Sequence, residues 1–169
     1  MTALEQMGQK ARAAARVLAS AGEKKDRALY RIAEAFRKES DAIRKANEQD
    51  LAAAKQNGMS QSLLDRLTLT PQRLESMAQG VEEVAAQPDP VGLVLEGGRR
   101  PNGLMIEKVT VPLGVIGMIY EARPNVTGDA AALCLKAGNA VILRGGKEAF
   151  HSNQAIANVM RGALQEAGP

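Results

Sequence analysis

The chain contains few of the residues that mark metal centres, disulfide frameworks and base-stacking surfaces. Its 169 residues include one Cys, one His, no Trp, two Tyr and two Phe. A single Cys excludes an intramolecular disulfide and a cysteine-rich zinc site, and a single His does not supply a histidine-based metal site. Four aromatic rings are too few for a surface that stacks nucleic-acid bases. We therefore expect no metal and no nucleic-acid partner.

Long apolar runs and blocks of like charge are also missing. No run approaches the ~20 apolar residues that a membrane helix needs, and no signal-peptide core follows Met1. The net charge is only +3, and the charges are interspersed along the chain. The length is sufficient for one domain with a real hydrophobic core. These observations predict a cytoplasmic protein without a membrane partner.

Helical periodicity dominates residues 1–90. Leu29, Ile32 and Phe36 recur at helical spacing and form an amphipathic stripe. Thr70-Pro71 is typical of a helix start, because Thr can cap a helix and Pro is tolerated in its first turn. We predict an N-terminal helical region over residues 1–90, with its carboxylates on solvated helix surfaces.

Two short β-like runs follow, over Val91–Glu96 and Leu104–Val111. Asn102-Gly103 lies just before the second run, and Asn-Gly between two such runs is typical of a β-hairpin. Polar and apolar residues alternate in the second run, so one of its faces should be wet. We predict a hairpin over residues 91–111 that projects from the sheet or pairs with another chain.

Residues 112–169 resemble the start of an α/β domain in their order of elements. The apolar runs Val115–Tyr120 and Ala140–Leu143 do not alternate, as in parallel strands buried on both faces. Between them lies a segment of helical length, Val126–Lys136, and a last helix follows with Ser152 as its expected cap. Two strands are fewer than a complete doubly wound sheet has. We therefore expect an incomplete α/β domain, in the N-terminal portion of a larger protein.

Two polar clusters follow the two predicted strands. A right-handed crossover places the carboxyl ends of both strands at one edge, where open α/β sheets bind ligands. The cluster after the second strand comprises Arg144, Gly145, Gly146 and Lys147. The glycines would let the backbone approach a ligand, and the two cations suit a ribose phosphate. A tight turn with solvated charges is the alternative, and no G-x-G-x-x-G fingerprint is present.

The cluster after the first strand contains Glu121, Arg123 and Asn125. An Asn amide can donate to an anionic oxygen, so Asn125 is a candidate oxyanion or substrate contact; the alternative is that it caps the helix beginning near Val126. Cys134 lies in an apolar stretch of that helix and is expected to be a buried structural thiol. His151 is expected to serve a turn or cap. No nucleophile–base pair is evident in the sequence.

Four strings of residues resemble those of γ-glutamyl phosphate reductases, also called glutamate-5-semialdehyde dehydrogenases, within the aldehyde dehydrogenase superfamily. The resemblance covers essentially the whole chain. It is carried by Leu64-Asp65-Arg66-Leu67, Asp89-Pro90-Val91-Gly92, Pro112–Val126 with Tyr120-Glu121-Ala122-Arg123-Pro124-Asn125 at its centre, and Leu135–Glu148 with Arg144-Gly145-Gly146-Lys147-Glu148 at its end.

The resemblance implies an NADP-binding domain, a catalytic domain and an oligomerisation ribbon. It implies NADPH-dependent reduction of L-glutamate 5-phosphate in proline biosynthesis by a homo-oligomer, through a catalytic Cys located beyond position 169. Glu121, Arg123 or Asn125 would then contact substrate, and Arg144 with Lys147 would favour NADP over NAD. Two other hypotheses remain: a non-catalytic oligomerisation or interaction module, and a weak nucleic-acid binder.

Overall fold

The computed structural model describes residues 2–167, and positions 168 and 169, the last two of the expected α/β start, lie outside the described residues. The chain has an α/β fold, as predicted. The elements, in chain order, are α1 (Ala3–Leu18), α2 (Lys24–Lys38), α3 (Ser40–Gln56), α4 (Gln61–Leu67), α5 (Pro71–Ala86), β1 (Val94–Arg99), β2 (Met105–Val109), β3 (Val115–Ile119), α6 (Asn125–Lys136), β4 (Ala140–Arg144), a 3-10 turn η1 (Lys147–Ala149) and α7 (Phe150–Glu166). Among residues 2–167, no helix is long and apolar enough to cross a membrane.

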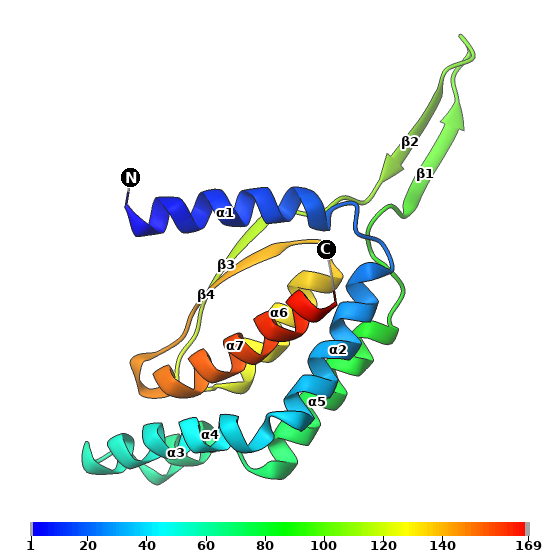
Figure 1. Cartoon of the computed structure of the whole chain (residues 1–169). Helices are drawn as coiled ribbons and strands as arrows, with labels where there is room; N and C mark the ends of the chain where they lie inside the picture. The colour runs from blue at the N-terminus through cyan, green and yellow to red at the C-terminus, as the bar shows by residue number, and fades with distance from the viewer. Residues whose placement is uncertain (1, 168–169) are drawn as a thin grey trace.

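The helices of the first half lie beside those of the last third (Figure 1), and one hydrophobic core joins them. The predicted stripe on α2 lies at its centre, because Leu29, Ile32 and Phe36 are fully buried. They pack in one cluster with residues of α5, α6 and α7, among them Val81 and Ile156. Truncating a buried Phe such as Phe36 to Ala typically costs about 3–5 kcal/mol. The packing of α6 and α7 therefore depends on the helical first half.

Two buried lysines connect the end of α5, and the residues just after it, to neighbouring helices. The sequence did not predict that these lysines are buried. Lys25 Nζ donates to Asp89 Oδ1 at 2.9 Å, and its side chain is 1% exposed. Lys136 Nζ donates to Asp26 Oδ1 at 2.6 Å and to the carbonyl oxygen of Ala85 at 2.8 Å, with 4% of its side chain exposed. Each ammonium group is thus paired, as a buried charge must be.

β3 and β4 form a two-stranded parallel sheet in which Val115 pairs with Ala140 and Ile119 with Arg144. The helix α6 makes the predicted crossover between them. Figure 1 shows α1 on one side of these strands and α6 with α7 on the other. The expectation that both strands are buried on both faces is wrong for this chain: β3 alternates between exposed and half-buried residues, and Ile119 is 80% exposed. The reason is that α1 and α6 pack mainly on β4 and leave β3 partly uncovered.

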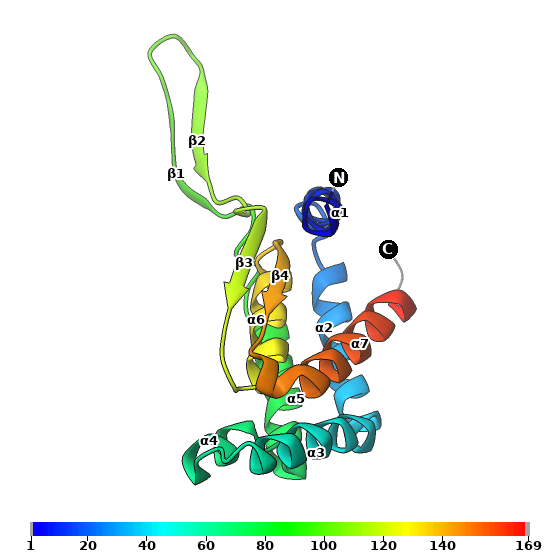
Figure 2. The ribbon, with the colours of Figure 1, turned by 90° about the vertical axis from the view of Figure 1, so that its left-hand side faces the viewer.

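β1 and β2 form the predicted antiparallel hairpin, with an irregularity between Val94 and Glu96. At its tip, the Arg100 amide donates to the Leu104 carbonyl at 2.8 Å, and Gly103 adopts the left-handed φ of 89° that glycine favours. The hairpin extends away from the helices in both views (Figures 1 and 2). Every residue of both strands is exposed, so both faces of the hairpin contact solvent. The prediction that only one face contacts solvent is wrong.

Candidate functional site at the carboxyl edge of the sheet

The loops that follow β3 and β4 meet, as the sequence predicted. The Tyr120 amide donates to the Arg144 carbonyl at 3.1 Å, which extends the parallel pairing to the start of the first loop. A side-chain carbon added at Gly146 would lie 3.4 Å from the backbone carbonyl carbon of Glu121. The two predicted polar clusters therefore share one edge of the sheet.

Gly145 and Gly146 leave space that neighbouring side chains of the chain itself occupy. A side-chain carbon at Gly145 would collide with the amide of Asn153, and one at Gly146 with the carboxylate of Glu148. Neither glycine has a left-handed φ. Close approach of a ligand to these glycines, which the sequence predicts, stays a prediction. Arg144 and Lys147 are exposed, and neither has an ion-pair partner within residues 2–167.

A chain of hydrogen bonds between hydroxyl and amide side chains stabilises this edge of the sheet. The hydroxyls of Tyr120 and Thr127 lie 2.6 Å apart, and Thr127 Oγ1 donates to Asn153 Oδ1 at 2.9 Å. Burial raises the pKa of Tyr120, and the hydrogen bond with Thr127 acts in the opposite direction. These hydrogen bonds connect the end of β3, the first turn of α6 and the first turn of α7, and so fix the two loops relative to each other.

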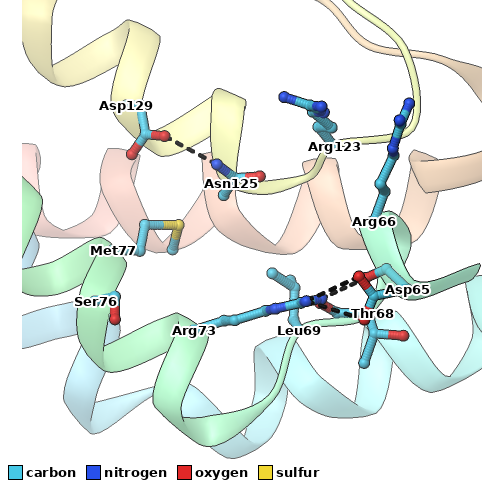
Figure 3. A pocket seen from close by; sticks show the side chains of 10 residues that line it. All are labelled: Asp65, Arg66, Thr68, Leu69, Arg73, Ser76, Met77, Arg123, Asn125 and Asp129. Carbon is cyan, nitrogen blue, oxygen red and sulfur yellow. Dashed lines mark hydrogen bonds and ion pairs between the residues drawn. The ribbon is translucent and has the colours of Figure 1, made fainter. Parts of the chain in front are cut away.

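A pocket of about 380 Å³ opens beside the first loop (Figure 3). It lies between the α4–α5 segment and the start of α6, and a smaller cavity of about 80 Å³ adjoins the end of β3. Arg66 and Arg123 line both cavities. Of the three predicted substrate-contacting residues, Arg123 and Asn125 line the larger cavity, whereas Glu121 lines the smaller one. The larger pocket is lined by Asp65, Arg66, Thr68, Leu69, Arg73, Ser76, Met77, Arg123, Asn125 and Asp129.

The three arginines of the larger pocket differ in how they are paired. Arg73 Nη2 lies 3.0 Å from Asp65 Oδ1, and the same guanidinium also donates to the carbonyl oxygens of Asp65 and Thr68. Its charge is therefore balanced, and it holds the turn between α4 and α5. The guanidinium groups of Arg66 and Arg123 have no hydrogen-bond or ion-pair partner in the described part of the chain. Two free guanidinium groups form a natural site for a phosphate or carboxylate, since each offers a planar fork of donors.

Asn125 is not the cap of α6, so that alternative is wrong. Pro124 occupies the capping position, and Asn125 is the first residue of the helix. Its side-chain amide donates to Asp129 Oδ2 one turn later, at 3.0 Å. Burial raises the pKa of Asp129, and the Asn125 hydrogen bond partly offsets that rise. In Figure 3 the Asp129 carboxylate lies on one side of the pocket, and the side chains of Arg66 and Arg123 lie on the other.

A buried polar network forms the wall behind the pocket. Asn47 donates to the Leu67 carbonyl and accepts from the Leu69 amide, both at 2.8 Å, and so fixes the pocket-lining segment between α4 and α5. Asn47 also donates to Ser152 Oγ at 3.0 Å. These contacts connect the pocket wall to the first turn of α7.

The contacts of Asp50 show that three predictions are wrong: those for Asp50 itself, for Ser152 and for His151. Asp50 is 3% exposed and not a solvated surface carboxylate. Ser152 does not cap α7, which begins at Phe150; instead, its amide and hydroxyl donate to Asp50 Oδ2 at 2.8 and 2.6 Å. His151 lies inside α7, with its Nδ1 2.8 Å from Asp50 Oδ1. A carboxylate from α3 therefore caps α7 from outside, where it also meets the positive end of the helix dipole.

Cys134 is buried, as expected, and burial raises the pKa of its thiol. A raised pKa disfavours the thiolate that a nucleophile requires. Two pocket residues were missed as site candidates: Arg66 and Asp129. Arg66 belongs to one of the strings that carried the family resemblance, and Asp129 follows Asn125 by one helical turn. Only the fold shows that both face the same pocket.

These features define part of an α/β protein that has a charged pocket at the carboxyl edge of its parallel strands. No family model matches the chain. Curated relatives do: it is 59% identical over 162 residues to a γ-glutamyl phosphate reductase of Moorella thermoacetica, with 95% of this chain and 39% of the relative covered. The corresponding protein of Rhodospirillum rubrum is 56% identical over 163 residues, covering 96% of this chain and 38% of the relative.

Solved structures of γ-glutamyl phosphate reductases share the fold. The crystal structure of the Thermotoga maritima enzyme aligns with a TM-score of 0.96 at 42% identity, over 98% of this chain and 40% of that one. The Saccharomyces cerevisiae structure gives 0.93 at 38% identity, over 98% and 42%. In both sequence and structure, this chain is similar to part of the γ-glutamyl phosphate reductases. It spans only about two fifths of the length of these relatives.

Proposed function

We propose that this chain forms the substrate-binding and cofactor-facing part of an NADPH-dependent γ-glutamyl phosphate reductase. The reaction converts L-glutamate 5-phosphate, NADPH and a proton into L-glutamate 5-semialdehyde, phosphate and NADP⁺, as an oxidoreductase step of proline biosynthesis. The observation that carries the proposal is the pair of unpaired guanidinium groups, Arg66 and Arg123, in a pocket beside the carboxyl edge of the sheet. That pocket belongs to a chain 59% identical to a γ-glutamyl phosphate reductase.

The proposed division of labour follows from where the charges lie. Arg66 and Arg123 would bind the acyl phosphate, and Asn125 would donate its amide to a substrate oxygen beside them. Glu121 faces the smaller cavity, which Arg66 and Arg123 also line, and would contact the substrate there. Binding both phosphate and carbonyl in this way fixes the substrate for attack by a nucleophile, which accounts for much of an enzymatic rate enhancement.

NADPH would supply the hydride when bound. The residues that fit it are Arg144 and Lys147, exposed cations at and just after the end of β4 that have no ion-pair partner among residues 2–167. The nucleophile has no candidate in this part of the chain, because the Cys134 thiol is buried and its pKa is raised. We place the catalytic Cys beyond position 169, as the family resemblance implies.

The three regions of the chain would then have two roles. Residues 1–90 and 112–169 would together form the pocket and the cofactor-binding edge of the sheet. The hairpin of residues 91–111 would serve as an oligomerisation ribbon in a cytoplasmic homo-oligomer. The exposed apolar side chains on both faces of the hairpin support that role, among them Val94, Leu95 and Ile106. The alternative of a non-catalytic interaction module rests on the same hairpin but leaves the charged pocket without a purpose.

The proposal is tested with the purified full-length enzyme by following phosphate-dependent reduction of NADP⁺ with L-glutamate 5-semialdehyde. We expect R66A and R123A each to raise the KM for phosphate roughly tenfold or more, because a charge-assisted hydrogen bond contributes about 1.5–3 kcal/mol. R73A is the matched control, since Arg73 is already paired with Asp65; it should lower stability and leave the KM for phosphate within about threefold. Wild-type enzyme that fails to turn over these substrates would disprove the proposed activity.

The 169-residue chain alone is expected to be inactive in the same assay, because it lacks a reactive thiol. The matched variant is C134S, which should change nothing. Turnover by the isolated chain that disappears in C134S would show that Cys134 is the nucleophile and would overturn the proposed division of labour.

A further inference from the structure

The larger pocket carries charges of both signs on opposite sides. Once the pair between Arg73 and Asp65 is set aside, the charges that remain are Arg66 and Arg123 on one side and Asp129 on the other. A ligand with anionic groups alone would satisfy the arginines and leave the carboxylate facing a second negative charge. The pocket therefore suits a ligand that has an anionic end and a cationic end.

Asp129 has the capacity to bind such a cation. Within residues 2–167 its carboxylate has a single hydrogen-bond partner, the side-chain amide of Asn125 at 3.0 Å, and forms no ion pair. A carboxylate offers about four lone-pair sites, so acceptor positions remain open toward the pocket. The residue is half-buried on α6, where reduced contact with water strengthens an ion pair relative to one on the open surface.

The substrate proposed above has this polarity. L-glutamate 5-phosphate carries its acyl phosphate at one end and, at the other, an α-ammonium group beside the α-carboxylate, with two methylene carbons between the phosphorylated carbonyl carbon and the carbon that bears the nitrogen. With the phosphate at Arg66 and Arg123, the α-carbon end of the substrate would extend toward the other side of the pocket, where Asp129 lies. We propose that Asp129 binds the α-ammonium group of the substrate and makes the enzyme select a free amino acid over deaminated or N-acylated analogues. This inference rests on the proposed function and assigns a specificity-determining residue to it.

Charge and size would both distinguish the free amino acid from its deaminated and N-acylated analogues. An analogue that lacks the amine leaves Asp129 without its cation, and an N-acyl analogue replaces the cation with a neutral amide. Either change removes a charge-assisted hydrogen bond, and the acyl group must also fit against Met77 and Ser76 in the same pocket wall. Sites built to bind a polar group reject an analogue lacking it more strongly than apolar pockets reject a missing methylene.

The variant D129N removes the negative charge and keeps an acceptor for the Asn125 amide, so the start of α6 should remain in place. The experiment measures kcat/KM of full-length wild type and D129N in the oxidative direction, with phosphate and NADP⁺. The two aldehydes are L-glutamate 5-semialdehyde and 5-oxopentanoate, which differ only in the α-amino group. For each aldehyde, the result is the ratio of kcat/KM for D129N to kcat/KM for wild type. Hydration or cyclisation of the aldehyde in solution cancels in this ratio, because both enzymes are measured on the same solution.

We expect D129N to lower kcat/KM for L-glutamate 5-semialdehyde roughly tenfold to a hundredfold, and for 5-oxopentanoate less than about threefold. The KM values for phosphate and NADP⁺ should stay unchanged. D41N is the control, because Asp41 is a 95%-exposed carboxylate on α3; it should alter neither ratio. Equal losses on the two aldehydes would show that Asp129 acts only on structure and would overturn the inference while the proposed function stands. Failure of wild type on both aldehydes would remove the proposed function and this inference with it.

Discussion

The Ser152 hydroxyl donates to Asp50 Oδ2 at 2.6 Å across 102 residues of sequence. The same carboxylate also accepts from the backbone amides of His151 and Ser152. One side chain of α3 thus holds the first turn of α7 and, next to Asn47, the wall of the charged pocket. The integrity of the pocket depends on this contact between the first half of the chain and the last helix.

We expect D50A to lower the free energy of unfolding by roughly 2–6 kcal/mol. Two buried donors of Ser152 lose their acceptor, and each unsatisfied group costs about 1–3 kcal/mol. The measurement is chemical denaturation of the full-length protein, followed by helix content. E48A is the control: Glu48 is exposed on the same helix and has no partner within residues 2–167. Equal midpoints for D50A and E48A would contradict the structural role of Asp50.

The sequence predicts what is local and periodic. The stripe of Leu29, Ile32 and Phe36, the Asn102-Gly103 hairpin and the strand–helix–strand unit depend on neighbours within a few residues, and the structure confirms each of them. The expected cap at Ser152 failed because its partner is Asp50, on a distant helix, and no local pattern encodes such a pair.

The sequence also predicts only those parts of the candidate site that depend on the order of elements along the chain. The chain order of strands places Arg123 and Arg144 at one edge, since the crossover rule fixes where strand ends lie. Arg66 and Asp129 reach the pocket through the packing of α4 against α3 and of α5 against α6, which sequence spacing does not specify. Burial of β3 was overestimated because an apolar run shows which surface needs covering and does not show which element covers it.

The ion cluster of Arg37 with Glu75 and Glu82 should make stability depend on pH. Arg37 Nη2 lies 2.9 Å from Glu75 Oε1 and donates to Glu82 Oε2 at 2.9 Å, so it connects α2 to α5. The hydrogen bonds from Arg37 lower the pKa of both carboxyl groups below the ordinary value of 4.5. A carboxyl group with a lowered pKa in the folded state stabilises fully above 4.5 and loses its contribution as the pH falls through the folded-state pKa.

We therefore expect R37M to lower the Tm near neutral pH and to lower it progressively less as the pH falls from 4.5 toward 3. All three side chains are at least one-third exposed, so the effect should be modest and should shrink in 1 M salt. Thermal unfolding of wild type and R37M between pH 3 and 7 measures it. R31M is the control, since Arg31 pairs with Glu34 within one helix. A difference between wild type and R37M that stays constant across this range would show that Arg37 acts through packing and not through charge.

The last prediction concerns the choice of cofactor by Arg144 and Lys147. Both are exposed at the carboxyl edge, one on each side of Gly145-Gly146, and neither has an ion-pair partner among the described residues. A ribose 2′-phosphate carries up to two negative charges that NADH lacks, so losing a cation should weaken NADPH far more than NADH. We expect R144A to reduce the preference for NADPH roughly tenfold to a hundredfold, and K147A to reduce it less, because a guanidinium fork holds two oxygens and an ammonium makes a point contact. The measurement is the ratio of NADPH to NADH dissociation constants for the full-length wild type and both variants, with R161A, an exposed arginine on α7, as the control. An unchanged ratio in both variants would mean that the phosphate is bound elsewhere and that this cluster is a turn with solvated charges, because no other property of Arg144 or Lys147 distinguishes the two nucleotides.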